Sequence, residues 1–323
     1  MRAAGLSPRA LAAWAGTERL AALPPRLPAL RAREPVPAAA ALALFVAGAE
    51  LAADRCRALP LDALIAAGLV ERVSGEPAGE DTRDGIARVG PAVRARVAIL
   101  PLGRGLLVCD RADAPDAPEL VCWPDDSSHH LAGALPPGRR ARWLDLGCGS
   151  AFAALARPEA AARLVGVDLN PRAIEHARLG LALSGIEHAE VAPGDAAGDH
   201  GAADLVTCNA PIPGDPHAAI WRRTDAGFLA RLTAAIPARL LPGGLAIVHT
   251  AREALPAELP GERVFVAYAP AAPAFGVLWW RPDAPARAID AYRELTAARP
   301  HLDPHDRDAA LAGASSTRAT GPT

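Results

Sequence analysis

What the sequence lacks already limits the kinds of protein it can encode. It has no lysine and no glutamine, and its 34 basic residues are all arginine. They face 36 acidic residues, which gives a formal net charge of -2, so no positive excess marks a nucleic-acid-binding surface. Together with the heavy use of alanine and proline, the exclusive use of arginine points to a GC-rich bacterial genome.

Cysteine pairs and long apolar runs are missing too. The five cysteines are scattered without a C-x-x-C pair, which argues against a disulfide framework and against a structural zinc site. The apolar run at residues 36–49 is alanine-rich and shorter than the ~20 residues that span a bilayer, so it favours a buried helix. Residues 1–25 lack the uninterrupted apolar segment of a secretory signal. We therefore expect a cytoplasmic protein with reduced thiols, no metal and no membrane segment.

The composition does supply a core. Hydrophobic residues make up 51% of the 323 positions and charged residues 22%, which excludes a chain that is disordered overall. At roughly 150 residues per domain, this length suggests two domains. The pattern along the chain predicts an accessory domain at 1–125, a second domain at 126–282 and a C-terminal segment at 283–323.

The accessory domain is predicted to be helical and to end in a β-hairpin. Ser7 followed by Pro8 is a helix-start signal, and the alternating apolar pattern after residue 92 favours strands. Three helices followed by a hairpin resemble a winged helix, which can bind DNA or serve as a packing or substrate-selecting module. Without net positive charge, DNA binding through Arg94, Arg96 and Arg104 is disfavoured. The expected elements are helices at 10–23, 37–56 and 61–73 and strands at 93–100 and 106–110.

From residue 142 onward, short apolar runs alternate with helix-like stretches. Strands that alternate with helices predict an α/β fold, in which helices cover both faces of a parallel sheet. Two late apolar runs without a helix between them predict a closing antiparallel hairpin, and the end of the chain after 301 is expected to be disordered. The expected strands are 143–146, 164–167, 205–208, 245–249, 264–267 and 275–280, and the expected helices are 152–156, 171–183, 227–241 and 286–298.

The first strand of this domain ends in the most informative stretch, W-L-D-L-G-C-G-S at residues 143–150. Gly147 and Gly149 have no Cβ, so a ligand can lie directly against the backbone of the turn. In open α/β sheets, nucleotides bind at this first turn. A Gly-x-Gly pair alone is weak evidence, because a tight turn without a ligand has the same pattern.

Three acidic residues at successive strand ends sharpen the interpretation. Asp145 precedes the glycines, where a buried carboxylate can hold an ammonium group. Asp168 ends the next strand about 20 residues on, a spacing that suits a carboxylate accepting both ribose hydroxyls. Asp195, after Pro193 and Gly194, can accept from an adenine amino group. Each acid alone is most often a solvated strand-end residue, but together they predict a bound nucleoside.

The motifs D-L-G-C-G-S, V-G-V-D-L-N, P-G-D and D-L-V-T-C-N-A-P-I resemble those of the class I S-adenosylmethionine-dependent methyltransferases. The similarity covers roughly residues 134–281. It is greatest to the branch with an Asn-Pro-Pro-aromatic motif, which includes the release-factor glutamine methyltransferases and amino-methylating nucleic-acid enzymes. The front end also looks like that of bacterial "methyltransferase small domain" proteins with an accessory domain. The resemblance implies a Rossmann-like sheet and S-adenosyl-L-methionine as the cofactor.

The resemblance also implies roles for individual residues. Asp145 and the glycine turn hold the methionine part, Asp168 the ribose and Asp195 the adenine, while the segment 123–128 leads into a short helix that covers the cofactor. In the family, the asparagine side chain and the next backbone carbonyl accept N–H bonds from a planar amine or amide. The implied cofactor-binding residues are Asp145, Gly147, Cys148, Gly149, Asp168, Leu169, Asp195 and Asn209, and the implied catalytic motif is Asn209, Ala210, Pro211 and Ile212.

Two departures from the family pattern bear on cofactor and substrate. Ala151 stands where a further glycine is common, and alanine is small enough to keep cofactor binding. Ile212 replaces the aromatic residue that stacks on a planar target. Because stacking on a base is worth roughly 1–3 kcal/mol, this disfavours a nucleobase and weakens the case for a glutamine amide. A rigid loop after a strand is the structural alternative for the motif.

The sequence therefore predicts a methyltransferase that acts on a small molecule or a peptide of a bacterial biosynthetic pathway, by N- or O-methylation. Alternatives are amino-N-methylation of a protein glutamine or asparagine or of a nucleic acid, and a non-catalytic cofactor-binding or DNA-binding regulator. A nicotinamide dehydrogenase is disfavoured because Phe152 replaces a glycine of that fingerprint. Oligomeric state is left open. Candidate bases, each also interpretable as structural, are His129, His130, His217 and His249, and candidate pocket residues are Trp123 and Trp221.

Overall fold

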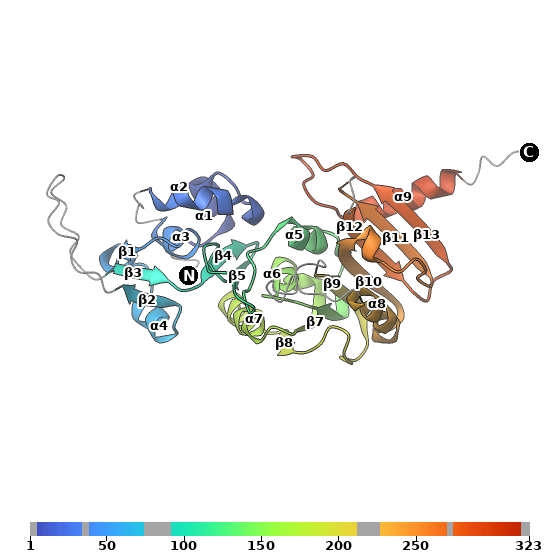
Figure 1. The fold of residues 1–323 in the computed structure, drawn as a ribbon, viewed down its shortest axis with the longest axis horizontal. Coiled ribbons are helices and arrows are strands. Elements are labelled where there is room, and N and C mark those ends of the chain that lie inside the picture. Colours follow the sequence, from blue (N-terminus) through green and yellow to red (C-terminus); the bar gives the residue numbers. More distant parts are fainter. Residues whose placement is uncertain (1–4, 34–38, 74–91, 212–226, 270–273, 318–323) are drawn as a thin grey trace, which may run out of the picture. The chain divides into compact units, whose positions relative to one another are not determined.

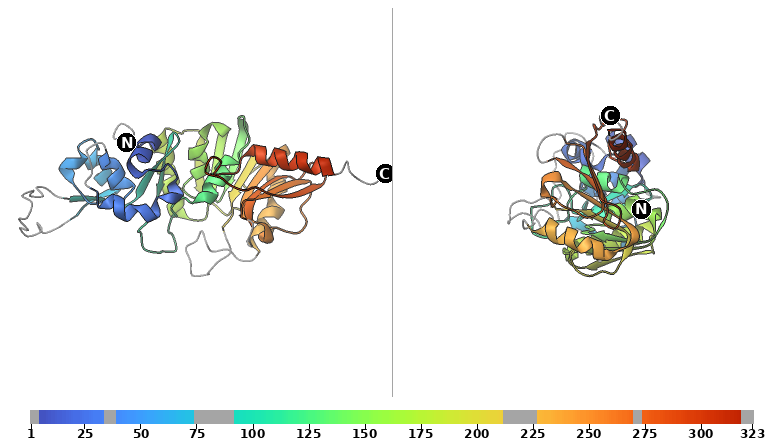
Figure 2. Two further views of the ribbon diagram at one scale, coloured as in Figure 1. Left: turned by 90° about the horizontal axis from the view of Figure 1, so that it is seen from above. Right: turned by 90° about the vertical axis from the view of Figure 1, so that its right-hand side faces the viewer.

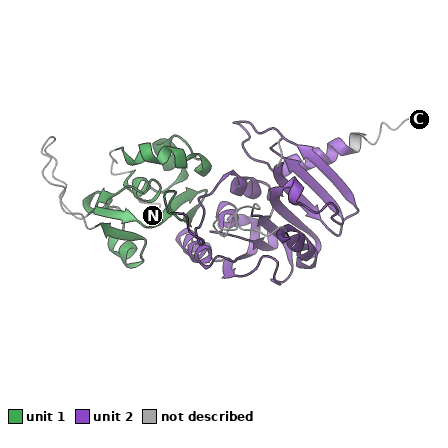
Figure 3. Cartoon of the chain, in the orientation of Figure 1, with its two compact units in different colours: residues 1–115 green, residues 116–323 purple. Residues whose placement is uncertain are grey.

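In the computed structural model, the described residues are 5–33, 39–73, 92–211, 227–269 and 274–317 (Figure 1). The chain divides into two compact units, residues 1–115 and 116–323 (Figure 3). Sequence analysis placed this boundary after residue 125 instead. Each unit is described by itself below.

The first unit begins with short helices. Helix α1 (Pro8–Ala15) starts at Ser7, whose side chain accepts from the Ala10 N–H at 3.2 Å, and it ends at Gly16 in the left-handed conformation. The helix expected at 10–23 is therefore wrong in length, because Gly16 ends it early. The short helices that follow are η2 (Leu20–Ala22), η3 (Pro24–Arg26) and α2 (Leu27–Arg31).

The rest of this unit contains more strand than the sequence suggested. The expected helix at 37–56 is a short helix followed by a strand and a 3₁₀ turn, and the one at 61–73 ends in a strand. The expected strand at 93–100 is two strands from two separate sheets. The winged-helix interpretation stays a prediction. The elements are α3 (Ala40–Phe45), β1 (Leu51–Ala52), η5 (Ala53–Cys56), α4 (Leu61–Ala66), β2 (Val70–Val73) and β3 (Ala92–Ala95) in a sheet of order β1-β3-β2, then β4 (Ala98–Leu102) and β5 (Gly105–Cys109).

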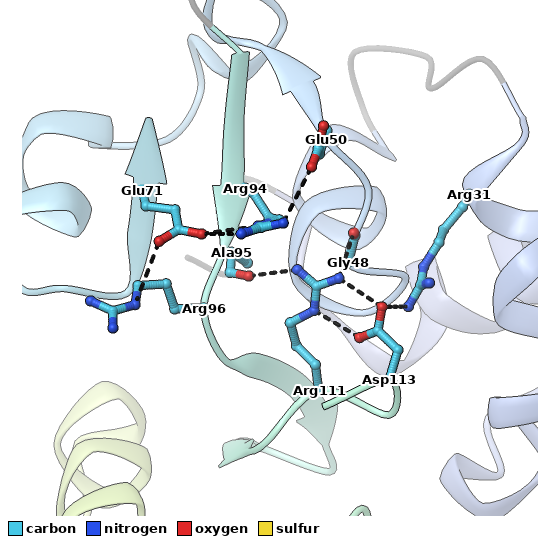
Figure 4. A network of polar contacts seen from close by, with 9 residues as sticks. All are labelled: Arg31, Gly48, Glu50, Glu71, Arg94, Ala95, Arg96, Arg111 and Asp113. Atoms are coloured by element: carbon cyan, nitrogen blue, oxygen red, sulfur yellow. Dashed lines mark hydrogen bonds and ion pairs between the residues drawn. The ribbon is translucent and has the colours of Figure 1, made fainter. Parts of the chain in front are cut away.

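A polar network links strands and loops of the first unit (Figure 4). Arg94 on β3 pairs with Glu71 on β2 at 2.6 Å. Arg111, just after β5, donates to the Ala95 carbonyl at 2.9 Å and pairs with Asp113 at 2.8 Å. Arg94, one of the arginines considered for phosphate contacts, is thus engaged with a carboxylate of its own sheet.

The second unit has the predicted α/β architecture, and its sheet has eight strands. The strand order is β13-β11-β12-β10-β9-β6-β7-β8. The five strands from β10 to β8 in this order are parallel, and β12 pairs antiparallel with both β10 and β11. The strands are β6 (Arg140–Leu146), β7 (Ala161–Asp168), β8 (Ala189–Pro193), β9 (Ala203–Asn209), β10 (Leu240–Ala251), β11 (Glu262–Ala267), β12 (Phe275–Arg281) and β13 (Arg287–Tyr292).

The chain order places a switch point beside β6. From β6 the chain continues to β7 and β8 on one side, whereas β9 and β10 lie on the other. Loops leaving β6 and β9 in opposite directions open a crevice at the carboxyl ends of the strands, which is where open α/β sheets bind ligands. The helices of this unit are α5 (Asp126–Gly133), α6 (Phe152–Ala156), α7 (Pro171–Ser184), α8 (Phe228–Arg239) and α9 (Pro304–Thr317).

Two expectations for the C-terminal segment are wrong. The helix expected at 286–298 contains strand β13, whose burial alternates with period two, and the tail expected to be disordered contains α9. Figure 2 shows α9 along the last strands. Asp306, 4% exposed, pairs with Arg293 at 2.8 Å and with Arg299 at 3.3 Å, and Leu302 is fully buried. These contacts order a segment whose sequence alone has little apolar character.

Candidate functional site

The carboxyl ends of β6, β7, β8 and β9 border one pocket. Its empty volume is about 850 Å³, solvent at the open side included. Of the predicted residues, its walls include Gly147, Gly149, Asp168, Leu169, Asn209 and Pro211. The motifs that sequence analysis selected from distant parts of the chain therefore converge on one cavity.

The glycine turn after β6 leaves space for a ligand. Gly147 and Gly149 both have positive φ, at 70° and 53°, and a Cβ on either would meet no atom within 4 Å. Glycine is needed here for its backbone conformation, and the open space lies against the backbone. Ala151, where the family often has glycine, is itself in the left-handed region at φ 62°, so the turn holds a strained non-glycine residue.

Asp168 fastens this turn to the end of β7. One carboxylate oxygen accepts from the Gly149 N–H at 2.8 Å and the other from the Asn170 N–H at 2.8 Å. Burial raises the pKa of Asp168, while these two N–H bonds lower it. Each oxygen retains a further lone pair, so the carboxylate can hold the turn and still accept a hydrogen bond from a hydroxyl group of a ligand.

Asp145 is a buried carboxylate, with 3% of its surface exposed. Thr207 on β9 donates to it at 2.5 Å, and the Trp143 indole N–H donates to Thr207 at 2.7 Å. Burial raises the pKa of Asp145 to about 6, and the charge of Asp168 adds to this rise. A buried carboxylate whose charge is only partly compensated can be stabilised by a cationic ligand group.

The remaining predicted cofactor residues follow the ends of β6, β7 and β8, and of these Leu169 lines the pocket, whereas Cys148 and Asp195 do not. Leu169 lines the pocket and is 58% exposed, an unusual position for a large apolar side chain. Cys148 is buried. Asp195 is exposed and accepts from the Ala197 N–H at 2.8 Å, while its neighbours Gly194 and Ala196 line the pocket.

The fourth motif lies at the end of β9. Asn209 lines the pocket, and its side-chain N–H donates to Ser127 on α5 at 2.8 Å. The Ala210 N–H donates to the His249 carbonyl on β10 at 3.0 Å, which fixes the backbone of the motif to the sheet. Ile212, His217 and Trp221 lie outside the described residues.

The described candidate bases belong to a cluster of rings in which His130 and His249 are buried and His129 is half-buried. The His249 ring contacts the Tyr268 hydroxyl at 2.9 Å, and the rings of His130 and Tyr268 stack at 4.0 Å. Burial lowers the pKa of His249 to about 4 and that of His130 to about 3, so both are neutral near pH 7. The His129 ring contacts Phe152 and His301. These contacts favour the structural interpretation of the three histidines.

Sequence analysis missed two residues of this site. Thr207 is a polar residue inside the apolar run 205–208, a signal that points to a buried partner. Ser127 belongs to the segment expected to lead into a covering helix, but nothing in the sequence indicates that it contacts Asn209.

Among the described residues, no helix has the length and apolar character needed to cross a bilayer.

Residues 123–266 match the family model of the methyltransferase small domain. Among solved structures, a putative methyltransferase from Pseudomonas syringae is 23% identical, with 48% of this chain and 96% of that chain covered and a TM-score of 0.37. The N-methyltransferase NodS from Bradyrhizobium japonicum is 20% identical over 48% and 92%, with a TM-score of 0.35. The YcgJ protein from Bacillus subtilis is 19% identical, with 39% of this chain and 50% of that chain covered and a TM-score of 0.32. A search of curated proteins gives no significant match.

Proposed function

This chain carries a class I S-adenosylmethionine-dependent methyltransferase domain, and we propose that it methylates a nitrogen or oxygen atom of a small molecule or peptide from a bacterial biosynthetic pathway. A nitrogen acceptor is favoured. The observation that carries this preference is Asn209, a polar side chain that lines the cofactor pocket at the end of β9.

The residues that line the pocket, together with Asp145 next to the end of β6, fit the cofactor. Asp145 supplies a buried carboxylate for the ammonium group, the Gly147–Gly149 turn leaves open space for the chain that carries it, and Asp168 supplies acceptors for the ribose hydroxyls. The exposed face of Leu169 suits an apolar planar ring. When bound, S-adenosylmethionine supplies an electrophilic methyl group, so the protein needs mainly to orient a nucleophile and exclude water.

Two acceptors in the fourth motif suit a nucleophile that bears N–H groups. The Asn209 side-chain carbonyl and the Ala210 backbone carbonyl accept hydrogen bonds, and neither can donate. An amine or amide nitrogen that donates two N–H bonds to them is held with its lone pair in one direction. A carboxylate substrate has no proton to donate and gains nothing from this pair.

A nucleic-acid acceptor has less support. Ile212 in place of an aromatic residue removes a stacking surface worth about 1–3 kcal/mol per base. In the first unit, Arg94 and Arg96 both pair with Glu71, at 2.6 and 3.8 Å, so a phosphate would have to compete with a carboxylate for them. With a net charge of -2, the chain lacks a general attraction for a polyanion.

The proposal is tested by measuring S-adenosylhomocysteine formation with matched sets of acceptors. The sets are small amines, small carboxylates, small alcohols, short peptides, intact proteins and oligonucleotides. We expect turnover with small or peptide acceptors that bear N–H groups, and a loss of at least 100-fold in kcat for Asn209→Ala with an unchanged Kd for the cofactor. Preferred turnover of a small alcohol or carboxylate would overturn the preference for nitrogen, and preferred turnover of an oligonucleotide or an intact protein would overturn the proposal.

A further inference from the structure

We propose that Ser127, itself held by Asp125, is a positioning residue that orients the side-chain amide of Asn209 with its carbonyl oxygen toward the acceptor. The inference rests on the proposed role of Asn209 in binding the nucleophile. It extends the acceptor site from the fourth motif to the first turn of α5, a segment 82 residues away from Asn209 in the sequence.

The directions of two hydrogen bonds carry the argument. The Ser127 hydroxyl donates to a carboxylate oxygen of Asp125. A hydroxyl has one proton, and a carboxylate only accepts, so this bond uses the only proton of Ser127. What Ser127 then offers Asn209 is a lone pair, and the 2.8 Å contact requires the NH₂ end of the amide to donate. The contact therefore distinguishes the two ends of a nearly symmetrical amide group.

The consequence for the pocket follows from the shape of an amide. Its oxygen and nitrogen lie on opposite sides of the same carbon, so an NH₂ group fixed on Ser127 leaves the carbonyl for the other side. Asn209 lines the pocket, and the free carbonyl is the end that can accept from a ligand. If the amide turned over, its carbonyl would face the lone pairs of Ser127, and two acceptors in contact repel each other.

Both Ser127, which contacts the Asn209 side chain, and the backbone that carries Asn209 are held by regular structure. Asp125 caps the first turn of α5, where it also accepts from the Ser128 N–H at 3.4 Å. The backbone after Asn209 is held by the bond from the Ala210 N–H to the His249 carbonyl at 3.0 Å. The sheet thus fixes the backbone of the motif, and α5 fixes the orientation of its side chain. A loose side chain would lose this selection, because either end of the amide could then face the acceptor.

The test uses two cofactor analogues and needs no methyl acceptor. Sinefungin carries an amine on the carbon that replaces the sulfonium centre and its methyl group, so its N–H bonds reach toward the acceptor side. S-adenosylhomocysteine carries nothing there. Calorimetry on the full-length protein gives both affinities, and their ratio reports the acceptor-side hydrogen bond apart from the rest of the site.

Asn209→Ala is expected to lower the ratio of sinefungin to S-adenosylhomocysteine affinity by about tenfold, and Ser127→Ala by about three- to fivefold. Ser127→Thr keeps the hydroxyl and is expected to restore the ratio to within twofold. Ser128→Ala, the matched change one position along α5, is expected to leave it unchanged.

The outcomes separate the two proposals. An unchanged ratio in Asn209→Ala overturns the acceptor role of Asn209 and the inference with it. A lowered ratio in Asn209→Ala with an unchanged ratio in Ser127→Ala overturns the inference alone. A ratio lowered equally by Ser128→Ala or Ser127→Thr, or a parallel loss of S-adenosylhomocysteine affinity in Ser127→Ala, would show a general disturbance of α5 and would also overturn it.

Discussion

Replacing Asp145 by asparagine is predicted to change stability and cofactor affinity in opposite directions. The carboxylate is 3% exposed, and its pKa lies near 6 instead of 3.8. A raised pKa means that the ionised form is less stable in the folded chain than in the unfolded one. This cost is present above the folded pKa and disappears below the unfolded pKa, so it is largest near pH 7.5. Asparagine keeps the shape and can still accept from Thr207, but it carries no charge.

The magnitude follows from the difference between the two pKa values. At about 1.4 kcal/mol per pKa unit, keeping Asp145 ionised costs the cofactor-free protein about 3 kcal/mol at pH 7.5 and about half of that at pH 5. Asp145→Asn removes this cost, which is worth a rise in Tm of several degrees for a unit of this size. The bound ammonium group loses its charged partner, and an interaction of this kind is worth about 2–5 kcal/mol, or at least about 30-fold in Kd.

Thermal unfolding and calorimetry together test this prediction. We expect the cofactor-free variant to have the higher Tm at pH 7.5, a smaller difference at pH 5, and a weaker affinity for S-adenosylmethionine at pH 7.5. Comparing the variant with the unsubstituted protein at each pH cancels the titration of all other groups. A lower Tm for the variant together with a Kd within twofold of the original would refute the reasoning, because Asp145 would then be a stabilising group without a ligand role.

Three further predictions concern the second unit. Gly276→Ala would place a Cβ 2.4 Å from the Val266 carbonyl and is expected to destabilise the protein by at least about 2 kcal/mol in urea unfolding, whereas Gly313→Ala meets no atom within 4 Å and is expected to gain up to about 1 kcal/mol from helix propensity. His249, whose folded pKa lies near 4, lets the unfolded chain bind more protons below pH 6.5. The contribution of neutral His249 to folding stability is complete above pH 6.5 and decreases as the pH is lowered below that value. When the pH is lowered from 7.5 to 5, His249→Gln is therefore expected to lose about 2 kcal/mol less of its free energy of unfolding than the unsubstituted protein. Equal losses in the two proteins would contradict this. Asp306→Asn weakens two ion pairs of a buried carboxylate and is expected to cost about 2 kcal/mol, with a lowered urea midpoint as the readout.

The parallel sheet and the cofactor pocket could be predicted because their signals are local. Strands β6, β7, β9 and β10 each contain a short apolar run, and Gly147, Gly149, Asp168 and Asn209 lie at or just after the ends of these strands. Once strands and helices alternate, parallel pairing brings these ends to one edge of the sheet. The convergence of Gly149, Asp168 and Asn209 on one pocket therefore required no knowledge of long-range contacts.

The elements that were predicted wrongly are those that long-range contacts decide. Alanine and arginine favour helix at residues 286–298, but pairing with β11 makes residues 287–292 a strand, in register from Glu262 opposite Arg287 onward. The segment around Leu302 has little apolar pattern of its own. It is ordered because the Leu302 N–H donates to His130 and because Asp306 gathers two arginines. Neither contact has a signal within its own sequence window.

The end of β6 and the glycine turn after it contain two features that do not help the chain to fold. Asp145 is a buried charge whose pKa shows that the folded state disfavours it, and Ala151 has a left-handed backbone that favours glycine. If folding stability were the only requirement, a neutral residue would be expected at position 145. The acid is explained if a bound cation compensates it, because a ligand present well above its Kd returns a few kcal/mol to the folded state. Cofactor binding should therefore raise the stability of this unit more in the unsubstituted protein than in Asp145→Asn. The position of this unfavourable charge is thus itself an argument for a cationic ligand.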